Sequence, residues 1–72
     1  MGDLYHPKYQ TLIAKLRKAR LDAGLTQVTA GKQLGKPQSY ISKIERGERY
    51  IGALEVADFA KTYKKPINFF LK

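Results

Sequence analysis

A chain of 72 residues is long enough for one domain only, and its formal net charge of +8 makes a polyanion such as a nucleic acid its natural partner. Hydrophobic residues form 43% of the chain and are spread along it, which excludes a disordered protein. Because the sequence has no cysteine, neither a disulfide framework nor a thiolate zinc site can add stability, and a small helical core must suffice.

The apolar residues do not indicate a membrane protein. They never approach the run of about 20 that spans a bilayer. Residues 1–9, which we interpret as a polar lead-in, lack the apolar stretch of a signal peptide. We therefore expect a cytoplasmic protein with no membrane partner.

Two helices are predicted in the first half of the chain, each ended by a glycine. Residues 10–23 carry apolar side chains at steps of four and three, the period of one helix face, and Gly24 lets the chain leave this helix. Residues 27–34 form the second helix, in which Thr26 can accept hydrogen bonds from the free amides of the first turn and Gly35 ends the helix.

The second half of the chain predicts two further helices and a short last segment. Pro37 suits the first turn of a helix over residues 37–46, because its missing amide hydrogen would be unbonded there. Residues 53–63 carry apolar side chains at amphipathic spacing, and Pro66 marks the end of that helix. The apolar residues 67–71 can add one or two turns of a fifth helix.

Residues 27–46 are the most informative segment, because two short helices joined by a tight turn must meet several steric demands together. Gly31 places the smallest residue where the second helix of the pair must cross closely, and Gly35 supplies the turn. Ile41 and Ile44 anchor the second helix in the core. The combination within one short window predicts a helix-turn-helix.

No segment of the sequence alternates like a β-strand. The predicted fold class is therefore all-α, a compact bundle of four or five short helices around one core. We predict a single domain over residues 1–72.

Three sequence features are more specific than these patterns. Residues 24–27 read Gly-Leu-Thr-Gln, residues 39–47 read Ser-Tyr-Ile-Ser-Lys-Ile-Glu-Arg-Gly, and Arg20 precedes Gln27 by seven positions. In these features the sequence resembles the phage-repressor and Cro type of helix-turn-helix, also called XRE-like transcriptional regulators, over roughly residues 16–71. The resemblance implies a five-helix domain whose third helix lies in the major groove of DNA, and a regulator that most often represses transcription.

The sequence also departs from the pattern of that family. Gly31 stands where alanine is usual, and Ala30 where a larger aliphatic residue is common. Pro37 replaces the serine or threonine that usually caps the recognition helix, and Lys64 replaces the glycine that often ends the fourth helix.

The polar side of the third predicted helix supplies the candidate base contacts. The Gln38 amide can both donate to and accept from the edge of adenine, and Lys43 can reach guanine acceptors or a phosphate. Ser39 and Ser42 are short and can contact a base edge or the backbone with little sequence preference. The alternative for all four is an ordinary solvated helix face.

Candidate phosphate contacts surround these residues. Gln27 resembles the family residue that anchors a phosphate at the start of the second helix, helped by the positive end of the helix dipole. The other candidates are Lys36, Tyr40, Arg46 and Arg49, which would position the protein without reading sequence. Alternatively, Tyr40 packs its ring on the domain edge, and the two arginines form surface ion pairs with Glu48.

Arg20 and Glu45 fall near the inward sides of their helices, and the family resemblance places them opposite one another. We expect a structural salt bridge between the first and third helices. Removal of one partner would leave a buried charge unpaired, at a cost of about 3 kcal/mol or more.

One recognition helix reads only about four or five base pairs, so we expect a symmetric dimer on a palindromic operator. The candidate interface residues are Ile67, Phe69, Phe70 and Leu71, because so many large apolar side chains in so short a segment would leave an exposed patch. Alternatively, Ile67 and Phe70 complete the core while Phe69 and Leu71 lie on the surface.

Other functions have less support in the sequence. His6 is the one histidine and lies in the lead-in without a partner for a metal or a nucleophile, so we expect no catalysis and no cofactor. An antitoxin-like module that binds a partner protein and regulates its own operon is the main alternative. RNA binding comes third, because the aromatic residues have core spacing and do not form a stacking platform.

Overall fold

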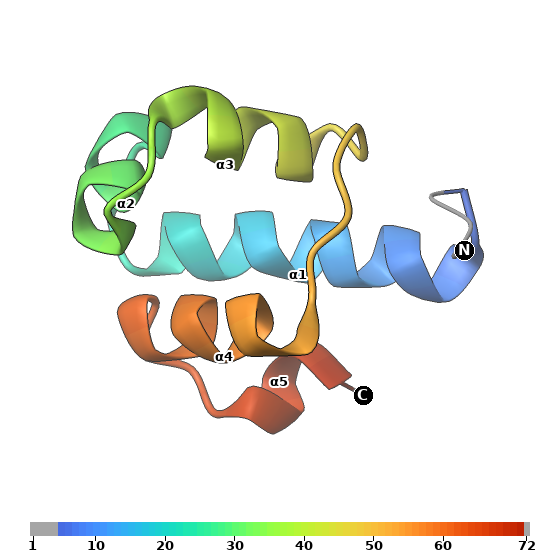
Figure 1. Ribbon diagram of the computed structural model, residues 1–72. Helices are drawn as coiled ribbons and strands as arrows, with labels where there is room; N and C mark the ends of the chain where they lie inside the picture. Colours follow the sequence, from blue (N-terminus) through green and yellow to red (C-terminus); the bar gives the residue numbers. More distant parts are fainter. Residues whose placement is uncertain (1–4, 72) are drawn as a thin grey trace.

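The computed structural model describes residues 5–71, which contain five α-helices and, in that range, no strand. The predicted all-α class is confirmed. The helices are α1 (Pro7–Asp22), α2 (Gln27–Leu34), α3 (Gln38–Glu45), α4 (Ala53–Thr62) and α5 (Ile67–Leu71). Figure 1 shows α1 running through the middle of the molecule, with α3 on one side of it, α4 and α5 on the other, and α2 beside its C-terminal end. None of these helices is long and apolar enough to cross a membrane.

The first helix begins earlier than predicted. It starts at Pro7, so the interpretation of residues 1–9 as a lead-in is wrong at its C-terminal end. The imidazole Nδ1 of His6 accepts a hydrogen bond from the amide of Lys8 at 3.1 Å and caps the helix. A proline at the first helical position loses no helical hydrogen bond, so Pro7 starts the helix here. Residues 1–4 lie outside the described residues.

The second helix has the predicted bounds, and local contacts explain both its ends. The Thr26 hydroxyl accepts a hydrogen bond from the amide of Thr29 at 3.1 Å, and the Thr29 hydroxyl accepts one from the amide of Thr26 at 2.8 Å. Gly35 ends the helix with a left-handed φ of 70°. At Gly31, a Cβ atom would lie 2.6 Å from the carbonyl oxygen of Lys36, so the close approach of the following segment requires glycine.

The chain leaves the fourth helix through a residue with left-handed backbone. Lys64, at the position where the family resemblance implies glycine, follows α4 with a φ of 58°. A non-glycine residue in this conformation costs roughly 1–2 kcal/mol. The adjacent Tyr63 is 2% exposed, and its burial offsets that cost.

One hydrophobic core takes side chains from every helix. Leu16 of α1, Ile41 and Ile44 of α3 and Phe59 of α4 are each at most 2% exposed. Phe70 of α5 is 4% exposed and belongs to the same core. This burial favours the alternative in which Phe70 completes the core over a place for Phe70 in a dimer interface.

Candidate nucleic-acid interface

The candidate base contacts share one face of α3. This recognition face consists of Gln38, Ser39, Ser42 and Lys43, of which Ser42 is half-buried and the others are exposed. The buried isoleucines of α3 hold the opposite face in the core. Pro37 precedes the helix with extended backbone, ψ 159°, and makes no capping hydrogen bond with its side chain. The helix therefore begins at Gln38, one residue later than predicted, and its first turn stays open to a partner.

Side-chain hydrogen bonds join the first residues of α2 and α3. Nε2 of Gln38 donates to Oε1 of Gln27 at 2.7 Å, and Nε2 of Gln27 donates to Oε1 of Glu45 at 3.1 Å. The sequence predicted separate roles for the two glutamines, one toward a base and one toward a phosphate, but no contact between them. The two side-chain amides therefore lie side by side.

Arg20 and Glu45, which were predicted to pair, form a buried ion pair between α1 and α3. Nε and Nη2 of Arg20 donate to Oε2 and Oε1 of Glu45 at 2.7 and 3.0 Å, and the two side chains are 8% and 6% exposed. Nη1 of Arg20 donates to the carbonyl of Leu25 at 2.9 Å. The hydrogen bonds to Glu45 raise the pKa of Arg20 above its ordinary value, although burial opposes them. The pair holds the C-terminal end of α3 against α1.

Tyr40 packs at the edge of the core. Its ring is parallel to that of Phe59, with the centroids 6.1 Å apart, and its hydroxyl donates to Glu55. Nζ of Lys36 and Cζ of Arg49 lie 5.2 and 4.7 Å from the centroid of the Tyr40 ring, within cation–π range. The hydroxyl is engaged by a carboxylate that would repel a phosphate. This geometry favours the packing alternative for Tyr40, whose ring positions two candidate phosphate contacts.

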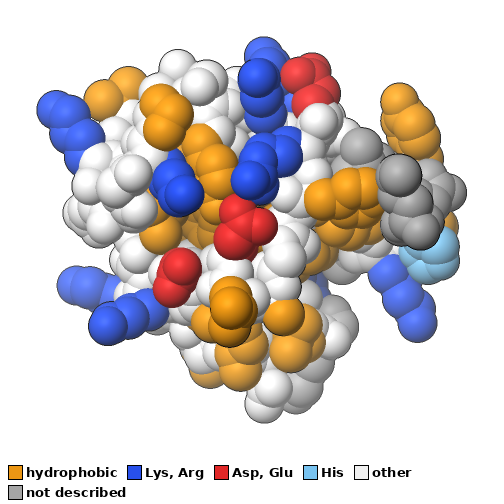
Figure 2. All heavy atoms as spheres, viewed as in Figure 1, with side chains coloured by type: hydrophobic (Ala, Val, Ile, Leu, Met, Phe, Trp, Pro, Cys, Tyr) orange, Lys and Arg blue, Asp and Glu red, His pale blue; other side chains and the backbone are white. Residues whose placement is uncertain are grey.

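The two arginines that follow the recognition face pair with different carboxylates. Nη2 of Arg46 lies 3.2 Å from Oε1 of Glu48, and both side chains are more than half exposed. Nη1 of Arg49 lies 3.0 Å from Oε2 of Glu55 and donates to the carbonyl of Tyr50 at 2.8 Å. Pairs at such exposure contribute about 1 kcal/mol or less, so both guanidinium groups can turn toward a phosphate at small cost. Figure 2 shows Lys and Arg side chains over α3 and the connection after it.

Tyr9 holds the turn between α3 and α4, and sequence reasoning missed it. Its hydroxyl accepts a hydrogen bond from the amide of Ile51 at 2.7 Å and donates to the carbonyl of Arg49 at 3.4 Å. The ring packs edge-on against Tyr50, with the centroids 5.3 Å apart. The bonded residues are 42 and 40 positions apart, so no local sequence pattern signals the contact. Tyr9 thereby fixes the backbone that carries Arg49.

A sequence profile described as helix-turn-helix matches residues 16–70 of the chain. The chain belongs to the XRE-type helix-turn-helix family. Among solved structures it is similar to the restriction-modification controller protein C.AhdI from Aeromonas hydrophila, with a TM-score of 0.75 and 26% sequence identity over 90% of this chain and 99% of that chain. No curated protein matches the chain. Family membership makes the protein a DNA-binding transcriptional regulator.

This helix-turn-helix protein exposes an apolar patch on α4 and α5. Leu54 is 84% exposed, Leu71 67% and Ile67 40%, whereas Phe69 is partly buried against the core. Figure 2 shows hydrophobic side chains at the surface over these two helices. The sequence predicted four interface residues in α5, Ile67, Phe69, Phe70 and Leu71, but not Leu54, the second residue of α4.

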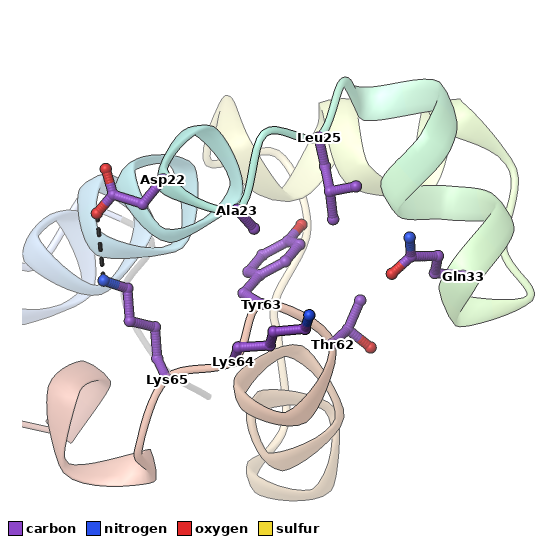
Figure 3. Close-up of a pocket in the computed structure, with 8 residues that line it drawn as sticks. All are labelled: Asp22, Ala23, Leu25, Gln33, Thr62, Tyr63, Lys64 and Lys65. Carbon is purple, nitrogen blue, oxygen red and sulfur yellow. Dashed lines mark hydrogen bonds and ion pairs between the residues drawn. The ribbon is translucent and has the colours of Figure 1, made fainter.

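A pocket of about 250 Å³ lies in another part of this helix-turn-helix domain. Its walls come from α2 and from the ends of α1 and α4, including Gln33 and Tyr63 (Figure 3). Lys65 forms an ion pair with Asp22 at one side, with 3.2 Å between Nζ and Oδ2. No residue of α3 lines the pocket, which is separate from the recognition face.

Proposed function

We propose that the protein is a transcriptional repressor that binds a palindromic operator in double-stranded DNA as a homodimer. The observation that carries this proposal is the recognition face, a row of exposed and half-buried hydrogen-bonding side chains on a short helix fixed to the core. Such a helix fits the major groove, where each base pair presents a distinct set of donors and acceptors. The net charge of +8 attracts the phosphate backbone.

The side chains divide into those that read sequence and those that position the protein. In this proposal Gln38 pairs with adenine and Lys43 with guanine or a phosphate, while the two serines contact base edges or backbone. The phosphate contacts are Gln27, Lys36, Arg46 and Arg49. They surround the recognition face, so they would fix the register of α3 in the groove.

A dimer is needed because one recognition face reads only about four or five base pairs. Leu54, Ile67 and Leu71 support this part of the proposal, since water-exposed side chains of this size on neighbouring helices form a surface suited to a second copy. A two-fold axis through such an interface would present two recognition faces to half-sites about one helical turn apart.

The similarity to a restriction-modification controller supports a regulator of this kind over an antitoxin-like module. His6, the one histidine of the sequence, caps α1 through its Nδ1 atom, so its imidazole has a structural role. A regulator of this class needs no cofactor and would act in the cytoplasm, where the operator is found.

Selection of bound sites from random duplexes tests the DNA-reading proposal. We expect an inverted repeat whose half-sites lie about one helical turn apart. The Gln38→Ala variant should lose preference at one base pair in each half-site and keep it elsewhere. Recovery of no common sequence would contradict the proposal.

Sedimentation at rising protein concentration, with and without the selected duplex, tests the dimer. Leu54→Ser and Leu71→Ser should shift the free protein toward monomer and reduce occupancy of the full operator. Leu21→Ser is the matched control, because this leucine of α1 is 57% exposed and lies outside the patch. A protein that stays monomeric and fills its operator as a single copy would exclude the dimer.

A further inference from the structure

The pocket between α2 and the ends of α1 and α4 is lined partly by apolar side chains. Its volume of about 250 Å³ lies just below the range of about 300–1,000 Å³ for pockets that hold drug-sized ligands, so it suits a smaller molecule. Ala23 and Leu25, from the turn after α1, and Tyr63, at the end of α4, form the apolar lining. Tyr63 belongs to the hydrophobic core and Leu25 packs against it, so this lining has a fixed position.

Polar groups face the same pocket from α2 and from the end of α4. Figure 3 shows the amide of Gln33 extending from α2 toward the pocket, with the amine of Lys64 and the side chain of Thr62 on the opposite side. Gln33 and Lys64 are exposed, so both side chains can adjust to a bound molecule. A few convergent polar groups beside an apolar lining are the usual composition of a small-molecule site.

The charges around the pocket favour an anion. Among the described lining residues Asp22 is the only acidic one, and two lysines neutralise its carboxylate. Oδ2 of Asp22 lies 3.0 Å from Nζ of Lys18 and 3.2 Å from Nζ of Lys65. Lys64 forms no ion pair with any residue between 5 and 71, so its amine is the uncompensated charge of the lining.

The backbone of Lys64 has a conformation that glycine would adopt at lower cost, with a φ of 58°. The amide of Lys64 donates to the carbonyl of Lys61 at 3.3 Å, and the amide of Lys65 donates to the carbonyl of Ala60 at 2.9 Å. These bonds end α4 and need no side chain at position 64. Residues in sparsely populated backbone conformations cluster at functional sites. The chain therefore carries a strained lysine where the helix end requires only a left-handed residue, and the lysine side chain lines the pocket.

We propose that this pocket binds a small carboxylate with an apolar body. The carboxylate pairs with the amine of Lys64, and the apolar body packs on Leu25 and Tyr63. Gln33 and Thr62 supply hydrogen bonds from the two sides of the pocket. No residue of α3 lines the pocket, so the site is separate from the recognition face and the inference does not rest on the proposed DNA-reading function. A molecule bound between α2 and α4 would stabilise the folded domain.

Titration of the free protein with benzoate, followed by heteronuclear NMR, tests the site. We expect saturable shifts of the backbone amides of Gln33, Thr62 and Lys64, with half-saturation at about 1 mM or below, which a ligand of this size can reach. Benzamide has the same shape without the charge, and inorganic phosphate has the charge without the apolar body. Each should bind at least about tenfold more weakly than benzoate, because each lacks one of the two contacts.

Variants at position 64 separate the specific contact from general attraction to a basic chain. Lys64→Gly removes the amine and suits the left-handed backbone, so it should fold as the wild type does and bind benzoate at least about tenfold more weakly. Lys64→Arg keeps the charge and should bind within about threefold of the wild type. Lys61→Ala is the matched control, because Lys61 is an exposed lysine at the same end of α4 that does not line the pocket.

The absence of saturable benzoate shifts at the pocket residues would overturn the inference. Equal affinity for benzoate and for either benzamide or phosphate would overturn it too, and so would wild-type affinity in Lys64→Gly. A loss in Lys61→Ala as large as in Lys64→Gly would also overturn it, since the anion would then be drawn by the net charge of +8 and not by the site. None of these results bears on DNA binding, which the titration does not involve.

Discussion

Replacement of Glu45 by alanine would leave a buried guanidinium without its counter-ion. The side chain of Arg20 is 8% exposed and would lose its hydrogen bonds to both carboxylate oxygens, keeping the bond from Nη1 to the carbonyl of Leu25. Breaking a buried pair in this way costs about 3–5 kcal/mol. A chain of 72 residues has an unfolding free energy of about 4–11 kcal/mol at roughly 0.05–0.15 kcal/mol per residue, so the loss is a large share of the total.

Urea denaturation followed by circular dichroism measures this loss. For a domain of this size about 1 kcal/mol corresponds to about 4–8 °C, so the thermal midpoint should fall by at least about 12 °C. Glu48→Ala is the matched control, because it removes the exposed pair with Arg46 and should cost less than about 1 kcal/mol. A double variant, Arg20→Met with Glu45→Leu, removes the charge along with its partner and should recover most of the loss.

Equal, small effects of Glu45→Ala and Glu48→Ala on the unfolding free energy would refute this reasoning. They would mean that water or another group solvates Arg20 when its partner is absent. A double variant as unstable as Glu45→Ala would show that the loss comes from packing and not from an unpaired charge.

Three other substitutions separate base reading, close packing and burial. Gln38→Ala should weaken the selected operator by about 1–3 kcal/mol in a fluorescence titration, while nonspecific binding and the thermal midpoint stay nearly unchanged. Gly31→Ala should lower the unfolding free energy by about 1–3 kcal/mol in urea, because the added Cβ would meet the Lys36 carbonyl oxygen at 2.6 Å. Burial raises the pKa of Tyr63 above its ordinary value of about 10, so the unfolding free energy should hold below pH of about 10 and fall above it, where the unfolded chain ionises first. Tyr63→Phe should make this alkaline fall shallower and change stability at neutral pH by about 1 kcal/mol or less, because the hydroxyl has no hydrogen-bond partner among the described residues.

Local signals in the sequence predicted most helix ends. Thr26 and Gly35 bound α2 as expected, because a capping hydroxyl and a left-handed glycine act on the backbone next to them. The start of α1 was missed because its cap is the imidazole of His6 and its first residue is a proline, neither of which belongs to the apolar pattern that predicted the helix. The left-handed backbone of Lys64 could not be predicted from the residue type, because lysine, unlike glycine, has no preference for that conformation.

The sequence predicted the site residues from the polar faces of single helices. It could not predict the contacts that orient those residues. Gln38 and Gln27 were both identified, but their hydrogen bond depends on how α2 and α3 cross, which no single helix pattern contains. The same holds for Tyr9 and Ile51, which meet only once α1 and the turn after α3 are packed. Periodicity likewise could not say that Phe70 fills the core while Leu54 stays in water, because both are large apolar residues near a helix end.

The salt dependence of binding to the selected duplex tests the central claim, that the recognition face and the surrounding cations read double-stranded DNA. The logarithm of the affinity should fall with the logarithm of salt concentration, with a slope of about 0.9 for each phosphate neutralised. A scrambled duplex should show a similar slope at much lower affinity, because phosphate contacts carry the salt effect and base contacts carry the preference. Affinity that is indifferent to salt, or stronger binding to single-stranded RNA than to the duplex, would contradict the account.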